Sequence, residues 1–257
     1  MREEPLQPTP EVPVEGPGPA EERTAPWPGW LGPAALGVMT AVAAIPVAII
    51  VAVKFAGDMP QGDIDPASLL PTVTLLSWQL VGNVICLGFV WWYLRKRVPT
   101  ARVQLGRGRP GWLLRAPLPT ALVCLAANLA YSGLVLLWTG EVPGFMLGEF
   151  MAKLSAPVDI AVAGVLVLVV APLTEEVVFR LLIYGSLRDR LPTGAAIWLS
   201  AFIFGAYHLD PAAFIPVTFL GLAAAWVYQR SGSLAVAVAT HAVFNVFGFL
   251  GIFLLKV

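Results

Sequence analysis

Charged residues are scarce in this chain, and cysteine and histidine are scarcer still. Only 12% of the 257 residues are charged, against about a quarter in soluble domains, which argues against a soluble globular protein. The formal net charge is zero, so we expect no nucleic-acid partner. The two cysteines, Cys86 and Cys124, lie inside apolar runs, which argues against a disulfide scaffold.

Apolar residues are what the chain has in abundance: 58% are hydrophobic and the mean hydropathy is +0.77. A helix needs about 20 apolar residues to cross a bilayer. The sequence therefore predicts an all-α, polytopic transmembrane helical bundle. The seven predicted spans are 31–54, 70–94, 116–138, 158–182, 194–208, 212–229 and 233–255. The fifth is short for a span, and a further apolar segment near 145–155 makes an eighth span an alternative.

Residues 1–30 are rich in proline and glutamate, a composition typical of a disordered tail. Loop 95–115 holds seven basic residues and no acid: Arg95, Lys96, Arg97, Arg102, Arg107, Arg109 and Arg115. The positive-inside rule places this loop, and by counting spans the N-terminus, in the cytoplasm. Because the composition of the tail is typical of a bacterial protein, we expect an integral protein of the bacterial inner (plasma) membrane.

Three charges interrupt the fourth predicted span: Glu175, Glu176 and Arg180. Ionisable side chains cost about 2.5–3.5 kcal/mol each at the centre of a membrane helix on insertion scales, so they indicate a functional site by default. Glu176 and Arg180 are four residues apart and can pair, whereas Glu175 points about 100° away. The two acids therefore need not share a role. The alternative is a buried Glu–Arg network that only holds helices together.

The chain's two histidines also lie in apolar segments. Phe204 shares a helix face with His208, and Asn245 shares one with His241. Each histidine could instead be an ordinary core residue, and the amide could bind helices together. Counting 1.5 Å per residue from the chain turns places Glu175, His208 and His241 at similar depth, so the spacing permits one intramembrane site.

In this order, Glu175-Glu176-x-x-x-Arg180, Phe204-x-x-x-His208 and His241-x-x-x-Asn245 resemble the three motifs of the CAAX protease and bacteriocin-processing (CPBP, or Abi) family of intramembrane proteases. The relatives of that family include the type II CAAX prenyl endopeptidase. The resemblance covers about residues 155–250. It divides the chain into the tail 1–30, N-terminal helices 31–154 with the basic loop, and a catalytic core 155–257.

The resemblance implies a glutamic-type hydrolase. Carried over by motif position, Glu175 is the base that activates water, His208 holds that water, and His241 and Asn245 stabilise the oxyanion. Glu176, Arg180 and Phe204 are supporting residues. We expect no cofactor: two histidines and two acids leave zinc as an alternative, but there is no His-Glu-x-x-His pattern.

The predicted function is therefore intramembrane hydrolysis of a peptide bond in a membrane-anchored protein or peptide. In a bacterium, removal of a C-terminal sorting tail or processing of a secreted peptide is favoured over cleavage of prenylated proteins. Two alternatives come from other classes. One is a transporter or proton relay, which also places Glu, His and Arg inside the membrane, although no inverted repeat is visible. The other is a non-catalytic immunity or scaffold protein.

Overall fold

The computed structural model describes residues 28–54, 72–97, 108–109 and 111–255. The predictions for tail residues 1–27 and for most of the basic loop (98–107 and 110) lie outside the described residues, as do residues 55–71 and 256–257. Within the described ranges the chain is helical and contains no strand. The predicted all-α class is thus confirmed for this part of the chain.

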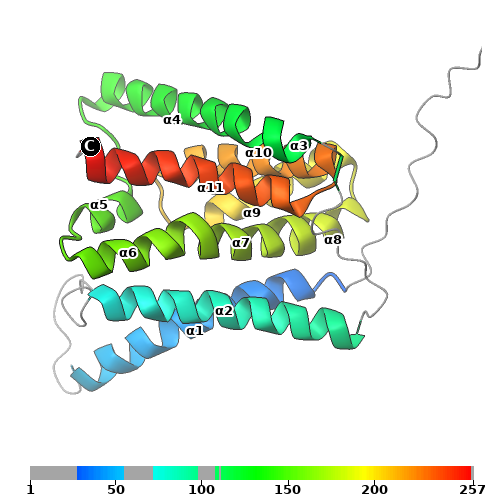
Figure 1. Cartoon of the computed structure of the whole chain (residues 1–257), viewed down its shortest axis with the longest axis horizontal. Helices are drawn as coiled ribbons and strands as arrows, with labels where there is room; N and C mark the ends of the chain where they lie inside the picture. The colour runs from blue at the N-terminus through cyan, green and yellow to red at the C-terminus, as the bar shows by residue number, and fades with distance from the viewer. Residues whose placement is uncertain (1–27, 55–71, 98–107, 110, 256–257) are drawn as a thin grey trace, which may run out of the picture.

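The helices run roughly along one direction and form a bundle (Figure 1). Its first half comprises α1 (Leu31–Lys54), α2 (Thr72–Arg97), the short α3 (Trp112–Arg115), α4 (Pro117–Thr139) and the short α5 (Met146–Ala152). A single continuous helix follows, made of α6 (Pro157–Val165), the π-helical segment η2 (Leu166–Val170), α7 (Ala171–Glu176), the π-helical segment η3 (Val177–Tyr184) and α8 (Gly185–Arg188). The chain ends with α9 (Thr193–Tyr207), α10 (Phe214–Ser231) and α11 (Leu234–Leu250), extended by the π-helical segment η4 (Gly251–Leu255).

Four helical stretches of the described chain are long and apolar enough to cross a membrane: Thr74–Lys96, Trp112–Thr139, Pro157–Arg188 and Leu234–Phe253. Helices α1, α9 and α10 also lie where spans were predicted, but the count of seven stays a prediction. One alternative is corrected. Helix α5 has seven residues, about 10 Å of helix, which is too short to cross a bilayer, so segment 145–155 is not an eighth span.

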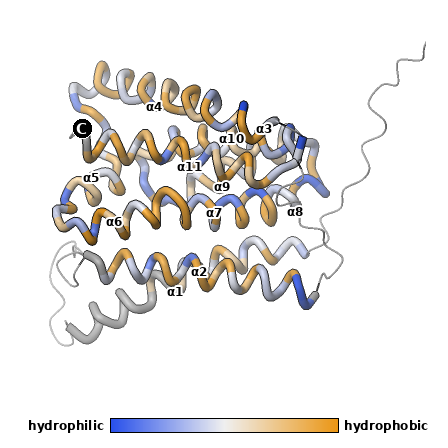
Figure 2. Tube along the Cα trace, viewed as in Figure 1, coloured by the Kyte–Doolittle hydropathy of each residue, from blue (hydrophilic) through white to orange (hydrophobic). Residues whose placement is uncertain are grey.

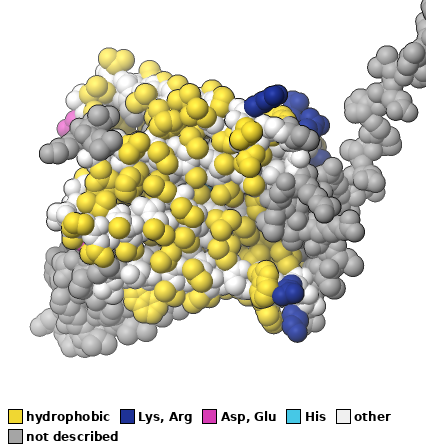
Figure 3. All heavy atoms as spheres, in the orientation of Figure 1, with side chains coloured by type: hydrophobic (Ala, Val, Ile, Leu, Met, Phe, Trp, Pro, Cys, Tyr) yellow, Lys and Arg dark blue, Asp and Glu magenta, His cyan; other side chains and the backbone are white. Residues whose placement is uncertain are grey.

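The outer surface of the bundle is apolar. Large hydrophobic side chains such as Leu114, Leu137 and Trp138 are 85–91% exposed, and Figure 3 shows hydrophobic side chains across the middle of the face in view. Figure 2 shows the same pattern along the backbone of α4, α6 and α11. Such a surface is stable in lipid and not in water, so these observations support an integral membrane protein.

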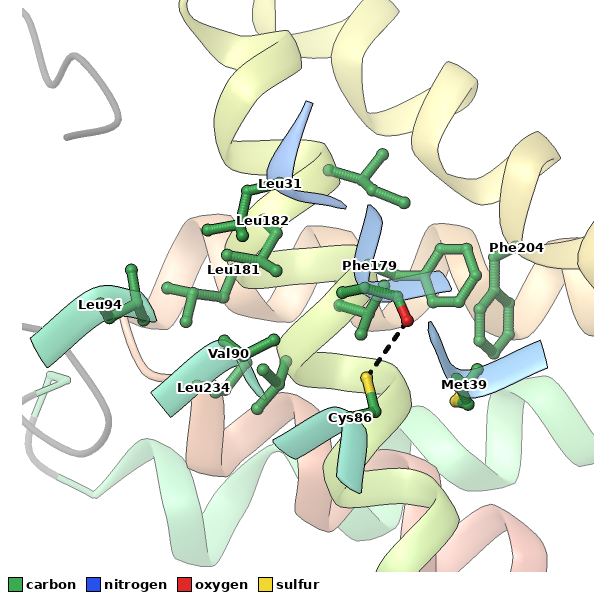
Figure 4. Packing of buried hydrophobic residues seen from close by; sticks show 14 of the residues in the cluster. Leu31, Met39, Cys86, Val90, Leu94, Phe179, Leu181, Leu182, Phe204 and Leu234 are labelled. Atoms are coloured by element: carbon green, nitrogen blue, oxygen red, sulfur yellow. Dashed lines mark hydrogen bonds between the residues drawn. The ribbon is translucent and has the colours of Figure 1, made fainter. Parts of the chain in front are cut away.

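The helix bearing the three charges lies between two groups of helices: α1 and α2 pack on one side of it, and α11 with α4 lies on the other (Figure 1). The core between α1, α2 and η3 includes Leu31, Met39, Val90 and Leu182 (Figure 4). Cys86 is buried there and donates to the carbonyl of Ala35 at 3.4 Å. Cys86 and Cys124 are both free and buried, as expected for ordinary membrane-core residues.

Candidate active site

The backbone hydrogen-bond ladder of the continuous helix from α6 to α8 is interrupted at Pro172. In η2 the N–H of Ala171 donates to the carbonyl of Leu166, five residues back. In that register the donor to the Val167 carbonyl belongs to residue 172, and proline has no N–H. The Val167 carbonyl instead accepts from Asn245 Nδ2 of α11 at 2.8 Å. The Thr174 hydroxyl donates to the carbonyl of Val170, one turn back in the helix, at 2.8 Å. The interruption thus ties the motif helix to the helix carrying His241.

Glu176 and Arg180 form the buried ion pair predicted from their spacing. Arg180 Nε lies 2.8 Å from Glu176 Oε2, Nη2 donates to Oε1 at 3.2 Å, and both side chains have zero exposure. The guanidinium also lies 4.6 Å from the centre of the Phe204 ring, a cation–π contact. His241 Nδ1 donates to Glu176 Oε1 at 2.9 Å. Glu176, the last residue of α7, therefore contacts both Arg180 of η3 and His241 of α11, and it does not line the cavity described below.

Glu175 has different neighbours from Glu176. Its Oε2 lies 3.8 Å from His241 Nε2 and 3.9 Å from His208 Nε2, and its side chain is 15% exposed. Both distances exceed a direct hydrogen bond, and Glu175 Oε2 is buried without a hydrogen-bond partner among the described residues. The two consecutive acids thus have separate environments, one buried in an ion pair and one facing both imidazoles.

The orientation of each imidazole follows from its Nδ1 contact. His208 Nδ1 lies 2.9 Å from the Phe204 carbonyl, which only accepts, so Nδ1 carries the proton. In a neutral His208 the Nε2 atom facing Glu175 is then an acceptor. The Phe204 ring packs edge-on against both imidazoles, with centroid distances of 4.9 Å to His208 and 5.7 Å to His241. Phe204 thereby fixes the positions of both histidines.

A cavity of about 310 Å³ opens beside these groups. Its described lining is mainly apolar, and its polar residues are Asn128, Glu175, His208, Asp210, His241 and Asn245. The structure thus brings together the four residues for which sequence predicts direct roles, while Glu176, Arg180 and Phe204 lie behind them. Among the described residues, no group of three or more His, Cys, Asp and Glu side chains is arranged to hold a metal ion.

Two components of the cavity wall were missed by the sequence reasoning, Asp210 and α5. Asp210 is 8% exposed and accepts from the backbone N–H groups of Met146 at 2.8 Å, Ala212 at 3.0 Å and Ala213 at 3.2 Å. Residues 145–148 and Met151 line the cavity, and Met151 is anchored in a core cluster with Leu154 and Leu166. The position of Asp210, two residues after the motif residue His208, was the signal in the sequence that could have indicated its place in the cavity wall.

Asp210 therefore holds the N-terminal end of α5 over the cavity. Hydrogen bonds to a charged group contribute about 1.5–3 kcal/mol. We expect Asp210→Ala to raise amide hydrogen exchange across 145–152 by about 10- to 100-fold, measured by mass spectrometry. Asp210→Asn is a partial control: its single amide oxygen can accept from Met146, but its NH₂ group then faces the N–H groups of Ala212 and Ala213, so we expect a smaller rise in exchange than in the alanine variant. Unchanged exchange in the alanine variant would show that α5 is held by its apolar contacts alone.

These features describe a polytopic helical membrane protein with one polar site enclosed by apolar helices. The family model "Type II CAAX prenyl endopeptidase Rce1-like" matches residues 157–247, the segment that carries all three motifs. This match confirms the predicted resemblance to CPBP-type proteases.

A relative of known sequence agrees with the family match. The Bacillus subtilis (strain 168) protein named "Putative membrane peptidase YdiL" is 29% identical over 107 residues, which are 40% of this chain and 44% of that protein. The match therefore spans less than half the length of the relative. No solved structure matches the chain.

Proposed function

We propose that this protein is an intramembrane endopeptidase that hydrolyses a peptide bond with a water activated by Glu175. The observation that supports this most directly is the position of Glu175 Oε2, 3.8 and 3.9 Å from two imidazole Nε2 atoms at the wall of an apolar cavity. The family match and the name of the relative agree with peptidase activity.

The proposed reaction begins with a water held between Glu175 and His208 Nε2. Glu175 accepts a proton from this water while the water oxygen forms a bond to the carbonyl carbon of the substrate. The carbonyl becomes a tetrahedral oxyanion. When it collapses, the C–N bond breaks and the proton on Glu175 passes to the leaving nitrogen. Glu175 thus takes part in both proton transfers. The proposed reaction needs no cofactor, and zinc is disfavoured because the sequence has no His-Glu-x-x-His pattern.

His241 and Asn245 are the proposed donors to the oxyanion. One N–H of Asn245 is used by the Val167 carbonyl, which leaves the second for the substrate. His241 Nδ1 donates to Glu176, so His241 donates from Nε2 only as an imidazolium. Each oxyanion donor is worth about 2.7–4 kcal/mol of transition-state stabilisation.

The orientation of Asn245 gives a prediction. Replacing Pro172 with Ala supplies the N–H that the Val167 carbonyl lacks and removes the lock on Asn245. We expect a thermal unfolding midpoint equal to or above that of the wild type, because proline is the poorest residue in a helix interior. We also expect kcat to fall by up to about 10²-fold, the scale of a 1 Å misplacement. Unchanged kcat would contradict this role for the proline.

The substrate is proposed to be a membrane-anchored protein or peptide, with removal of a C-terminal sorting tail or processing of a secreted peptide favoured. The basic residues of the described chain support the proposed topology, in which the N-terminus faces the cytoplasm of a bacterial inner membrane. Arg95 and Arg97 end α2, Arg115 lies at α3, and Figure 3 shows Lys and Arg gathered at one end of the bundle.

The test compares the C-termini of membrane proteins, by mass spectrometry, in cells carrying the wild-type chain and cells carrying Glu175→Gln. We expect C-termini present only with the wild type, and cleavage of the same proteins by chelator-treated purified enzyme in liposomes. Identical C-termini, together with solute flux that depends on Glu175, would instead support a transporter. Activity lost on chelation and restored by zinc would support a metalloprotease.

A further inference from the structure

Asn128 of α4 is a polar residue of the cavity wall that has no part in the proposed reaction. The motif residues of the wall surround the cleaved bond in that reaction, and the Asp210 carboxylate already accepts from three backbone N–H groups. Asn128 Oδ1 is buried and has no hydrogen-bond partner within the described part of the chain. Asn128 also lies outside residues 157–247, which the family model matches. Its amide therefore has unused hydrogen-bonding capacity beside the proposed active site.

The inner face of α4 brings Asn128 to the cavity. The buried residues of α4 are Pro117, Ala121 and Cys124, and Asn128 continues this row, since it lies four residues beyond Cys124. Helix α4 packs against α10 and α11, and α4 and α11 begin at the same end of the bundle (Figure 1). Asn128 lies eleven residues after the start of α4, and Asn245 lies eleven after the start of α11. The two amides are therefore at similar depth, about 16 Å along their helices.

A substrate held in this cavity has backbone groups that need partners. Because water attacks the carbonyl carbon, the segment around the cleaved bond has to leave its helical conformation, and its N–H and C=O groups then lose their intrahelical hydrogen bonds. Leaving such groups unpaired inside a membrane is costly, and the described walls are largely apolar, with Leu220, Phe244 and Phe249 among them. The Asn128 amide is complementary to a peptide group, since it offers both an acceptor and donors. Rotation about its Cβ–Cγ bond lets either end face the cavity.

We propose that Asn128 binds the backbone of the substrate, its side-chain amide pairing with one peptide group near the cleaved bond. This rests on the proposed function and adds a substrate-binding residue to its site. Packed helices lie about 8–10 Å apart, a distance that an extended peptide covers with about three residues. The paired peptide group therefore lies within about three residues of the cleaved bond. Because the pairing involves only backbone atoms, it holds apolar segments of differing sequence in the same extended conformation.

The first test measures binding of a membrane peptide that the wild-type protein cleaves in liposomes, with its cleaved bond mapped by mass spectrometry. Asn128→Leu replaces the amide with an apolar group of similar size. In the Glu175→Gln protein, which leaves the peptide intact, we expect Asn128→Leu to raise Kd about 5- to 50-fold. With Glu175 present, we expect KM to rise alike and kcat to stay within about threefold, because the pairing is the same before and during hydrolysis. An unchanged Kd would overturn the inference.

The second test locates the peptide group that pairs with Asn128. In a series of peptides, one backbone N–H near the cleaved bond is replaced at a time by an ester oxygen. We expect one ester to bind the protein that retains Asn128 more weakly than the parent peptide, and to bind Asn128→Leu as tightly as the parent does. A residue with only a structural role would weaken all the peptides alike. Equal losses in both proteins at every position would overturn the inference.

The stability of the protein without substrate separates binding from packing. Asn128→Leu removes a buried oxygen that has no described partner, so we expect an unfolding midpoint equal to or above that of the wild type. Thr218→Val is the matched control: it removes another such oxygen, outside the described cavity lining, and should leave Kd unchanged. A lower midpoint in Asn128→Leu, with all peptides weakened alike, would overturn the inference. Turnover by Glu175→Gln at the wild-type rate, with the ester effect still dependent on Asn128 in kcat/KM, would overturn the proposed base and leave the inference standing.

Discussion

Replacing Glu175 with Gln should lower kcat/KM by about 10²- to 10⁴-fold, the usual contribution of a general base, with little change in thermal unfolding. Glutamine has the same shape but cannot accept the proton of the attacking water. The structural cost is small, because no described donor lies within direct hydrogen-bond distance of Glu175 Oε2. The measurements are peptide hydrolysis in liposomes and the unfolding midpoint of the purified variant.

The neighbouring acid provides a matched control. Glu176→Gln makes the same chemical change one residue away, but in the buried ion pair with Arg180. We expect Glu176→Gln to lower the free energy of unfolding. We expect it to lower activity only indirectly, because His241 would be displaced. If Glu175→Gln retained wild-type turnover, the proposed base would be excluded. If it unfolded as readily as Glu176→Gln, Glu175 would be a structural residue.

The parts of the site that sequence could predict follow from helix geometry. The spacing of Glu176 and Arg180 predicted their pairing, and the rotation between consecutive residues predicted a separate environment for Glu175. The constant rise of a helix predicted that the two histidines lie at a membrane depth similar to that of Glu175. Each prediction needed only regular geometry and the rarity of charge in this chain.

The remaining features depend on contacts between distant segments. His241 donating to Glu176 links positions 65 residues apart, and Met146 bound to Asp210 links positions 64 apart. No local periodicity reports such contacts. The π-helical segments on either side of α7 were also unpredicted. Segment 145–155 was weighed as a span because it is apolar, whereas α5 is a short piece of the cavity wall.

Replacing Arg180 with Met is expected to reduce the free energy of unfolding by about 3–5 kcal/mol, the cost of breaking a buried ion pair. Methionine fills much of the same volume, so the loss is mainly electrostatic: Glu176 would stay buried with His241 as its remaining described donor. The Phe204 ring would also lose its cation–π contact. Denaturant titration in detergent measures the change, and Arg115→Met, at an exposed position of α3, should change it by less than about 0.5 kcal/mol.

The double variant Glu176→Gln/Arg180→Met distinguishes the contribution of the ion pair from the separate contributions of Glu176 and Arg180. It removes both charges while the Gln amide oxygen still accepts from His241 Nδ1, so no buried ion is left unpaired. Because neutral replacements of buried pairs are often tolerated, we expect it to be more stable than either single variant. Additive losses in the double variant would mean that Glu176 and Arg180 act independently. A stable double variant with little activity would instead show that the pair is retained because it orients His241 towards Glu175.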